Sequence, residues 1–93
     1  MLAFVLAKSV PDNLEWVIER IGKVEGIEEV FRVWRAYDIV ARASVESIEE
    51  LQEIVLKIQT MKHVLSTTTL MELKKKGKLD FKIDYRRAPN IPT

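Results

Sequence analysis

The chain has 93 residues, which is enough for one small domain built around a single shallow core. Its apolar fraction of 47% and charged fraction of 31% are typical of a folded soluble domain and argue against a disordered chain. With a formal net charge of +1 and no cysteine, the chain as a whole does not attract nucleic acid, and it has no disulfide, thiolate zinc site or cysteine nucleophile.

The first predicted elements are a strand over residues 2–8 and a helix over about residues 11–22. The strand is apolar at both alternating sets of positions, so we expect both of its faces to be covered. Lys8 ends this apolar run too early for a membrane span, and a signal peptide is not evident, so we expect a cytoplasmic protein. Pro11 suits a first helical turn, and apolar residues follow it at helical spacing: Leu14, Val17, Ile18 and Ile21.

Two strands are predicted next, over residues 27–34 and 37–45, joined by a short hairpin connection at Arg35 and Ala36. Alternation assigns the residues of the second of these strands to two faces. One face receives Tyr37, Ile39, Ala41, Ala43 and Val45, and the other receives Asp38, Val40, Arg42 and Ser44.

A capping box formed by Ser47 and Glu50 predicts the start of a second helix. Apolar residues then form one stripe along this helix: Ile48, Leu51, Val55 and Ile58. A fourth strand is predicted over residues 63–73, where consecutive hydroxyl residues at 66–69 favour a pleated surface.

The two halves of this pattern repeat each other. Leu14, Val17 and Ile21 recur as Ile48, Leu51 and Val55, each 34 residues later. A repeated strand–helix–strand unit predicts an α+β, ferredoxin-like βαββαβ sandwich, an antiparallel sheet with two helices on one face. Because the other face would remain apolar, we expect a homodimer or higher homo-oligomer with sheets packed face to face.

The C-terminal part differs from the rest in charge. Residues 1–73, the predicted domain, carry eight basic and twelve acidic residues, whereas residues 74–93 carry seven and two. Strict alternation of apolar and polar residues predicts a fifth strand over 79–85, after a basic hairpin loop and before a loose end at 88–93. This strand would pair within the subunit or across it, and a flexible basic arm that binds nucleic acid is the alternative.

Three segments of the sequence resemble a known family. Residues 33–40 (VWRAYDIV), the capped helix and residues 64–69 (VLSTTT) resemble the effector-binding domain, or RAM domain, of the Lrp/AsnC transcriptional regulators. The resemblance implies a domain that dimerises sheet to sheet and senses an amino acid or related metabolite without catalysis. Full-length members carry a DNA-reading helix-turn-helix before this domain. We therefore expect a stand-alone effector domain that has no sequence-specific DNA binding of its own and acts alone or with a full-length regulator.

The resemblance also points to the residues of an effector site. The family has glycine at the positions of Arg35 and His63, and Tyr37-Asp38 and Thr67-x-Thr69 match its motifs. The implied effector-binding set is Arg35, Tyr37, Asp38, His63, Thr67 and Thr69. Arg35 would pair with an effector carboxylate and Asp38 with an ammonium group. Structural roles in the hairpin and strands are the alternative for each.

Two tryptophans are candidate interface residues. Trp16 lies on the side of its helix away from the core, where it would contact another subunit or pack over neighbouring side chains. Trp34 would close the dimer interface or line the effector crevice. The sequence shows no nucleophile–base pair, no carboxylate dyad and a single histidine, so we expect no enzyme, no metal and no cofactor. A structural module that co-assembles with full-length regulators, without an effector, is the alternative function.

Overall fold

In a computed structural model of the chain, the backbone is described for residues 1–75 and 78–87 and the side chains for residues 1–72. The elements are β1 (Leu2–Ser9), a 3-10 turn (Pro11–Asn13), α1 (Leu14–Gly22), β2 (Ile27–Arg32), β3 (Ile39–Ser44), α2 (Ile48–Gln59), β4 (Val64–Lys75) and β5 (Lys78–Arg87). This order confirms the ferredoxin-like βαββαβ prediction, and the fifth strand predicted over residues 79–85 is present as β5. The predicted loose end at 88–93 and part of the basic loop lie outside the described residues.

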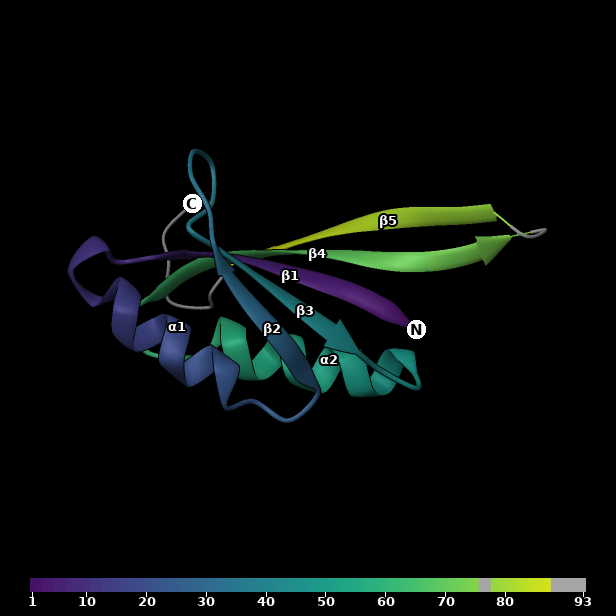
Figure 1. The fold of residues 1–93 in the computed structure, drawn as a ribbon, viewed down its shortest axis with the longest axis horizontal. Helices are drawn as coiled ribbons and strands as arrows, with labels where there is room; N and C mark the ends of the chain where they lie inside the picture. The colour runs from purple at the N-terminus through teal and green to yellow at the C-terminus, as the bar shows by residue number, and fades with distance from the viewer. Residues whose placement is uncertain (76–77, 88–93) are drawn as a thin grey trace.

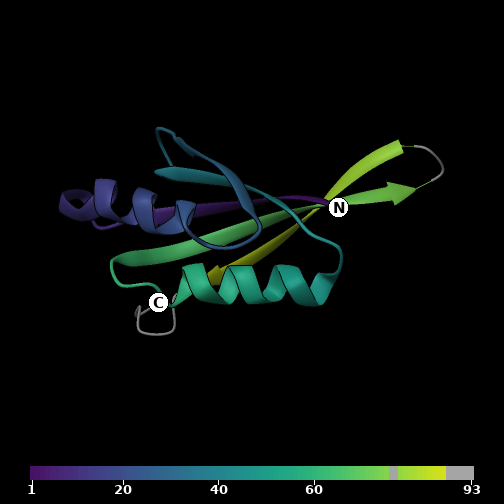
Figure 2. The ribbon, with the colours of Figure 1, turned by 60° about the horizontal axis from the view of Figure 1, so that its bottom comes forward.

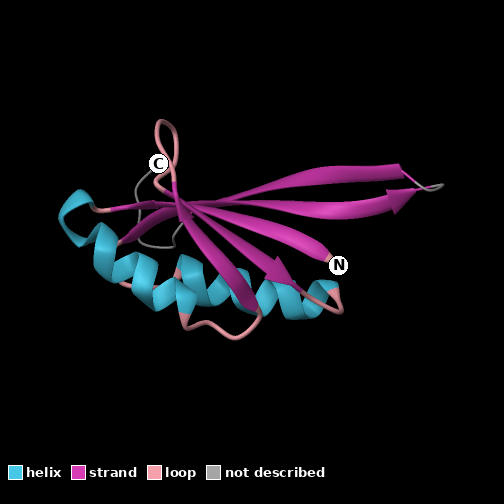
Figure 3. Ribbon diagram, viewed as in Figure 1, coloured by secondary structure: helices cyan, strands magenta, loops and turns pink. Residues whose placement is uncertain are grey.

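The strands form one antiparallel sheet in the order β2-β3-β1-β4-β5. Both helices cover the same face of this sheet (Figures 1 and 3). α1 packs on β2 and β3, whereas α2 packs on β4 and β1. β5 pairs with β4 of the same chain, with Thr68 opposite Tyr85 and Leu70 opposite Ile83. The sheet therefore extends by one strand beyond the pair that α2 covers.

The core lies between the sheet and the helices. Alternate residues of the two central strands point into it, because side chains of a strand alternate between faces. Alanines among them let the helices approach the sheet closely. The buried core consists of Ala3, Val5, Ala7, Val17, Ile21, Ile39, Ala41, Ala43, Val45, Leu51, Ile54, Val55, Ile58 and Val64.

The opposite face of the sheet, which we call the open face, is also largely apolar. Its apolar side chains are half-buried or exposed: Leu2, Phe4, Leu6, Phe31, Val40 and Leu70. At the β2 edge, Arg42 forms ion pairs with Glu29 at 2.6 Å and with Glu28 at 3.6 Å. An apolar sheet face of this kind is typical of a surface that packs against a partner.

α2 starts at its predicted cap, whereas α1 starts later in the chain than predicted. α1 begins at Leu14 rather than near residue 11, because Pro11–Asn13 form a 3-10 turn in which the Asn13 amide donates to the Val10 carbonyl at 3.0 Å. At α2, the hydroxyl of Ser47 accepts from the Glu50 amide at 3.1 Å, as the capping box predicts. The Glu50 carboxylate, however, accepts from the Glu46 amide at 3.1 Å, one residue before the cap.

The predicted two-residue hairpin between β2 and β3 is wrong. β2 ends at Arg32 and β3 begins at Ile39, so residues 33–38 form a longer loop that rises on the open-face side of the sheet (Figure 1). The Val33 amide donates to the Asp38 carbonyl at 2.8 Å and closes the base of this loop. Tyr37 consequently lies before β3 rather than on it.

Candidate effector site

Loop 33–38 is held to the end of β1 by Asp38. The Asp38 amide donates to the Ala7 carbonyl at 3.0 Å, and a carboxylate oxygen of Asp38 accepts from the Ser9 amide at 2.9 Å. The ladder between β1 and β4 shifts register at this point, between Lys8 and Ser9. A carboxylate accepts several hydrogen bonds, so this contact fixes the position of Asp38 and leaves further acceptor capacity.

Tyr37 connects the same loop to β4. Its hydroxyl hydrogen-bonds the hydroxyl of Thr68, which is buried. Thr68 pairs with Leu6 of β1, an open-face residue, and paired residues of antiparallel strands share a face. Tyr37 thus bonds on the open face, whereas the sequence pattern assigned it to the face of Ile39 and Ala41, which is the helix face. That assignment is wrong because Tyr37 belongs to the loop and not to the strand.

Thr67 and Thr69 lie on the other face. They pair with Ala7 and Val5 of β1, whose side chains are in the core beneath the helices. Both threonines are buried, and the Thr69 hydroxyl has no hydrogen-bond partner among the described residues. The structure therefore does not bring Thr67 and Thr69 together with Tyr37, and Thr68, which the sequence analysis did not select, takes that place. The pairing of β4 with β1 places Thr68 on the open face, and the sequence of a single strand does not show that pairing.

Arg35 and His63 share an unusual backbone conformation. Their φ angles are 87° and 74°, in the left-handed region that favours glycine. These are the two positions at which the resemblance expects glycine. The chain thus keeps the backbone conformation that glycine would favour but adds a cationic side chain at Arg35 and an imidazole at His63.

His63 faces the helix layer rather than the loop. Its carbonyl accepts from the Val10 amide at 2.9 Å, and its ring contacts Trp16 edge-on with 5.4 Å between ring centroids. Trp16 also lies 5.1 Å from the guanidinium carbon of Arg20, measured from the ring centroid. The side chain of Trp16 is still 41% exposed. Trp16 therefore packs over neighbouring side chains, and its role at an interface stays a prediction.

Trp34 is the most exposed large apolar side chain of the described residues, at 82%. The guanidinium of Arg32 lies 5.8 Å from its ring centroid, and Arg35 next to it is exposed. The structure brings Tyr37 together with Thr68 of β4 and Asp38 together with Ser9, and within residues 1–72 no contact joins these two pairs to the side chains of Trp34 or Arg35. The loop nevertheless carries an aromatic ring, a hydroxyl, a carboxylate and a cation within six residues. Such groups can hold a small zwitterion by hydrogen bonds and charge, but they contain no activated nucleophile.

Two further properties of the described residues bear on function. Within residues 1–72, no group of three or more histidine, aspartate and glutamate side chains is arranged to hold a metal ion. Neither helix of the described chain is long and apolar enough to cross a membrane.

Several solved structures are similar in fold. TTHA0845 from Thermus thermophilus is 28% identical, with a TM-score of 0.75, over 83% of this chain and 98% of that chain. A hypothetical protein, PHS023 from Pyrococcus horikoshii, is 20% identical, with a TM-score of 0.71 over 81% of this chain and 92% of that chain. FFRP-DM1 is 22% identical, with a TM-score of 0.68 over 73% of this chain and 92% of that chain.

Two curated relatives are larger proteins, both named homocitrate synthase. The protein from Sulfolobus acidocaldarius is 37% identical over 59 residues, which is 63% of this chain and 13% of that protein. The protein from Sulfurisphaera tokodaii is 29% identical in an alignment 85 positions long that covers 76% of this chain and 18% of that protein. The chain thus spans less than a fifth of the length of either relative.

The family comparison covers most of the chain. The model of the Lrp/AsnC ligand-binding domain matches residues 2–78, which run from the start of β1 to the start of β5. This range includes both helices, loop 33–38 and the whole of β4. The chain therefore belongs to the Lrp/AsnC ligand-binding domain family.

Proposed function

We propose that the chain is a non-catalytic sensing and oligomerisation module of cytoplasmic transcriptional regulation that binds an amino acid or a related metabolite. The observation that carries this proposal is the match of residues 2–78 to the Lrp/AsnC ligand-binding domain. The effector would favour one assembly of subunits over another and so shift their populations. The alternative within the same family is a structural module that co-assembles with a full-length regulator without binding an effector.

The proposed effector site is built on loop 33–38 and β4. Arg35 would bind the effector carboxylate, and Asp38 would accept hydrogen bonds from its ammonium group. The hydroxyls of Tyr37 and Thr68, which bond each other, would bind a further polar atom beside them. His63, Thr67 and Thr69 would support the site indirectly. The His63 carbonyl holds the chain at the end of β1, and the two threonines are buried on the helix face of β4. This differs from the set expected from the sequence by the addition of Thr68.

The proposed assembly is a homodimer in which two open faces pack together. Two sheets pack about 10 Å apart when their inner faces interdigitate, and such packing would bury the half-exposed Phe4, Leu6 and Leu70. Loop 33–38 rises on this same side, so the loop would lie near the second subunit (Figure 1). The ring of Trp34 contacts Arg32, which pairs with Glu15 of α1, and its role at the interface remains part of the proposal. The effector site would then lie next to the subunit boundary, which is how binding would influence assembly.

The experiment that tests this function is a thermal-shift screen against the twenty amino acids and common metabolites, repeated with Asp38→Asn. At a concentration a hundred times its Kd, an effector stabilises the folded state by about 2.7 kcal/mol. We expect one or two compounds to raise the Tm of the wild-type chain. We expect Asp38→Asn, which keeps an oxygen for the Ser9 amide, to lose that shift while the dimer persists.

Asp12→Asn is the matched control, because Asp12 is an exposed carboxylate in the turn before α1. Its response to the effector should equal that of the wild-type chain. An unchanged response of Asp38→Asn would remove Asp38 from the site. A wild-type chain with no response to any compound would contradict sensing and favour the structural module.

A second candidate function follows from the homocitrate synthase relatives. Both relatives contain a segment similar to this chain within a much longer protein. The same kind of module would then regulate a biosynthetic enzyme in response to an amino acid. The discriminating measurement is the rate of a homocitrate synthase with and without the added chain over a range of amino acid concentrations. An effector-dependent change in rate supports enzyme regulation, and an unchanged rate at saturating chain excludes it for that enzyme.

A further inference from the structure

A hollow on the helix side of the molecule gathers cationic side chains. It lies where the last turns of α1 and α2 are side by side (Figure 2), and its volume is about 970 Å³. A hollow of this size can hold a small organic ligand. Arg20 and Lys23 line it from the end of α1, and Lys57 and Lys62 line it from the end of α2. We call it the basic hollow.

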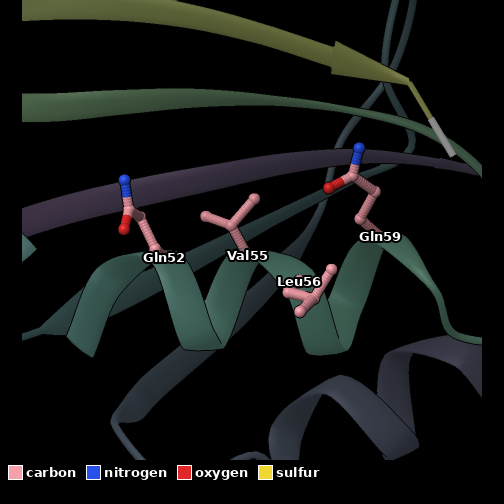
Figure 4. Close-up of a pocket in the computed structure, with 4 residues that line it drawn as sticks. All are labelled: Gln52, Val55, Leu56 and Gln59. Carbon is pink, nitrogen blue, oxygen red and sulfur yellow. The ribbon is translucent and has the colours of Figure 1, made fainter. Parts of the chain in front are cut away.

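This gathering of positive charge runs against the charge balance of the domain. Residues 1–73 carry eight basic and twelve acidic residues. Four of those eight basic residues line the basic hollow, but only one of the twelve acidic residues, Glu25, does so. A smaller hollow along another side of α2 is lined by uncharged residues, Gln52, Val55, Leu56 and Gln59 (Figure 4). The basic hollow is therefore the one of the two that suits an anionic ligand.

Most of these cations have no anionic partner in the domain. Within residues 1–72, Arg20, Lys57 and Lys62 form no ion pair. Lys23 pairs with Glu19 at 3.6 Å, but both side chains are exposed on one turn of α1, and such pairs are weak. The ammonium groups are therefore available to a ligand that enters the hollow.

The helix ends account for part of this charge but not for all of it. The C-terminal end of a helix carries roughly half a negative charge, which basic residues of the last turn offset. The ends of α1 and α2, together with Glu25, thus contribute roughly two negative charges beside the hollow. Four cations leave an excess of roughly two positive charges. An excess of this size matches a ligand with two or more negative charges, as phosphate groups provide.

The ring of Trp16 adds an aromatic wall at one end of the basic hollow. It is 41% exposed, its edge contacts His63, and the guanidinium of Arg20 lies 5.1 Å from its centroid. Val24 and Met61 also line the hollow, and both are half-buried and pack against the core. An exposed aromatic ring provides a surface on which the planar ring of a ligand can stack. The hollow thus combines an aromatic surface with a cationic one.

We propose that the basic hollow binds a nucleotide, with its phosphate groups on the lysines and its base against Trp16. Both parts of such a ligand find their chemical complement in one hollow. The hollow lies on the helix side, so sheet-to-sheet packing of two open faces leaves it accessible. It is also distinct from the proposed effector site at loop 33–38. The module would therefore respond to a nucleotide in addition to its effector.

Titration of ATP against the fluorescence of Trp16 tests this proposal. The chain has two tryptophans, so Trp34→Phe leaves Trp16 as the single reporter. We expect ATP to change its fluorescence in a saturable way. Adenosine and inorganic triphosphate, which each make only one part of the proposed contacts, should bind about tenfold more weakly or less. In the same background, Lys57→Gln combined with Lys62→Gln should raise the Kd for ATP about tenfold, because charged hydrogen bonds to phosphate are lost.

Lys8→Gln is the matched control, because Lys8 is an exposed lysine of β1 outside the hollow, and it should leave the Kd for ATP unchanged. Circular dichroism checks that the double variant is folded. If the two lysines only offset the helix end, the double variant loses stability in urea but binds ATP as tightly as before, which overturns the proposal. Unchanged fluorescence of Trp16 with ATP, equal binding of inorganic triphosphate and ATP, or an equal loss in Lys8→Gln would each overturn it as well.

Discussion

Arg35 combines a strained backbone with a proposed role in effector binding. Its backbone is left-handed, and its side chain is exposed on loop 33–38. For a residue with a Cβ this conformation costs about 1–2 kcal/mol, and glycine removes that cost but gains entropy in the unfolded chain. We predict that Arg35→Gly raises the free energy of unfolding by about 0.5 kcal/mol, measured by urea titration, while it weakens the response to an effector.

Gly26 provides the control for this prediction. Its φ is +98°, and an added Cβ would lie 2.6 Å from the Cδ1 atom of Ile54. Gly26→Ala should therefore lower the free energy of unfolding by about 1–3 kcal/mol. A loss of stability in Arg35→Gly as well would show that the side chain of Arg35 makes contacts that outweigh the strain.

Thr68 and Thr69 are neighbours in sequence with opposite roles. The Thr68 hydroxyl bonds Tyr37, whereas the buried hydroxyl of Thr69 has no hydrogen-bond partner among the described residues. We predict that Thr69→Val stabilises the fold by about 1 kcal/mol, because it removes an unpaired buried hydroxyl. Thr68→Val should destabilise it by about 1 kcal/mol, because it leaves the Tyr37 hydroxyl without that partner. Urea titration of both variants measures the difference, and equal changes would contradict a hydrogen bond at Thr68 that Thr69 lacks.

At the scale of the element, local patterns predicted every helix and strand. The apolar period of α1 and α2, the cap at Ser47 and the alternation of β5 all act within a few residues, so they are visible in the sequence. The β2–β3 connection was not predictable in this way. Its shape depends on contacts of Tyr37 with β4 and of Asp38 with β1, and on a positive φ at Arg35 that a non-glycine residue does not reveal.

The residues of the candidate site were also only partly predictable, because some of them depend on contacts between distant segments. Tyr37 and Asp38 were found through the family resemblance, and the structure places both in loop 33–38. Thr67 and Thr69 were selected by a motif, but which face a threonine occupies depends on the register of β4 against β1. Register is fixed by pairing across the sheet, so a single strand does not show it.

At the scale of the whole molecule, one face of the sheet remains apolar. This open face carries apolar side chains of the central strands, among them Phe4, Leu6 and Leu70. The sequence repeat predicted this surface, because a sheet with helices on one side only must expose the other. If two open faces pack together as proposed, an effector bound at loop 33–38 would lie near the subunit boundary and would shift the population of assemblies.

The proposed effector site lies at loop 33–38 and β4, and hydrogen–deuterium exchange with and without an effector from the screen tests it most directly. Ligand binding slows the exchange of amides that it orders or covers. We predict that the effector protects residues 33–38 and the amides around Thr68, with little change in α1. Protection confined to the helices, with loop 33–38 unchanged, would contradict the site and with it the proposed mechanism of sensing.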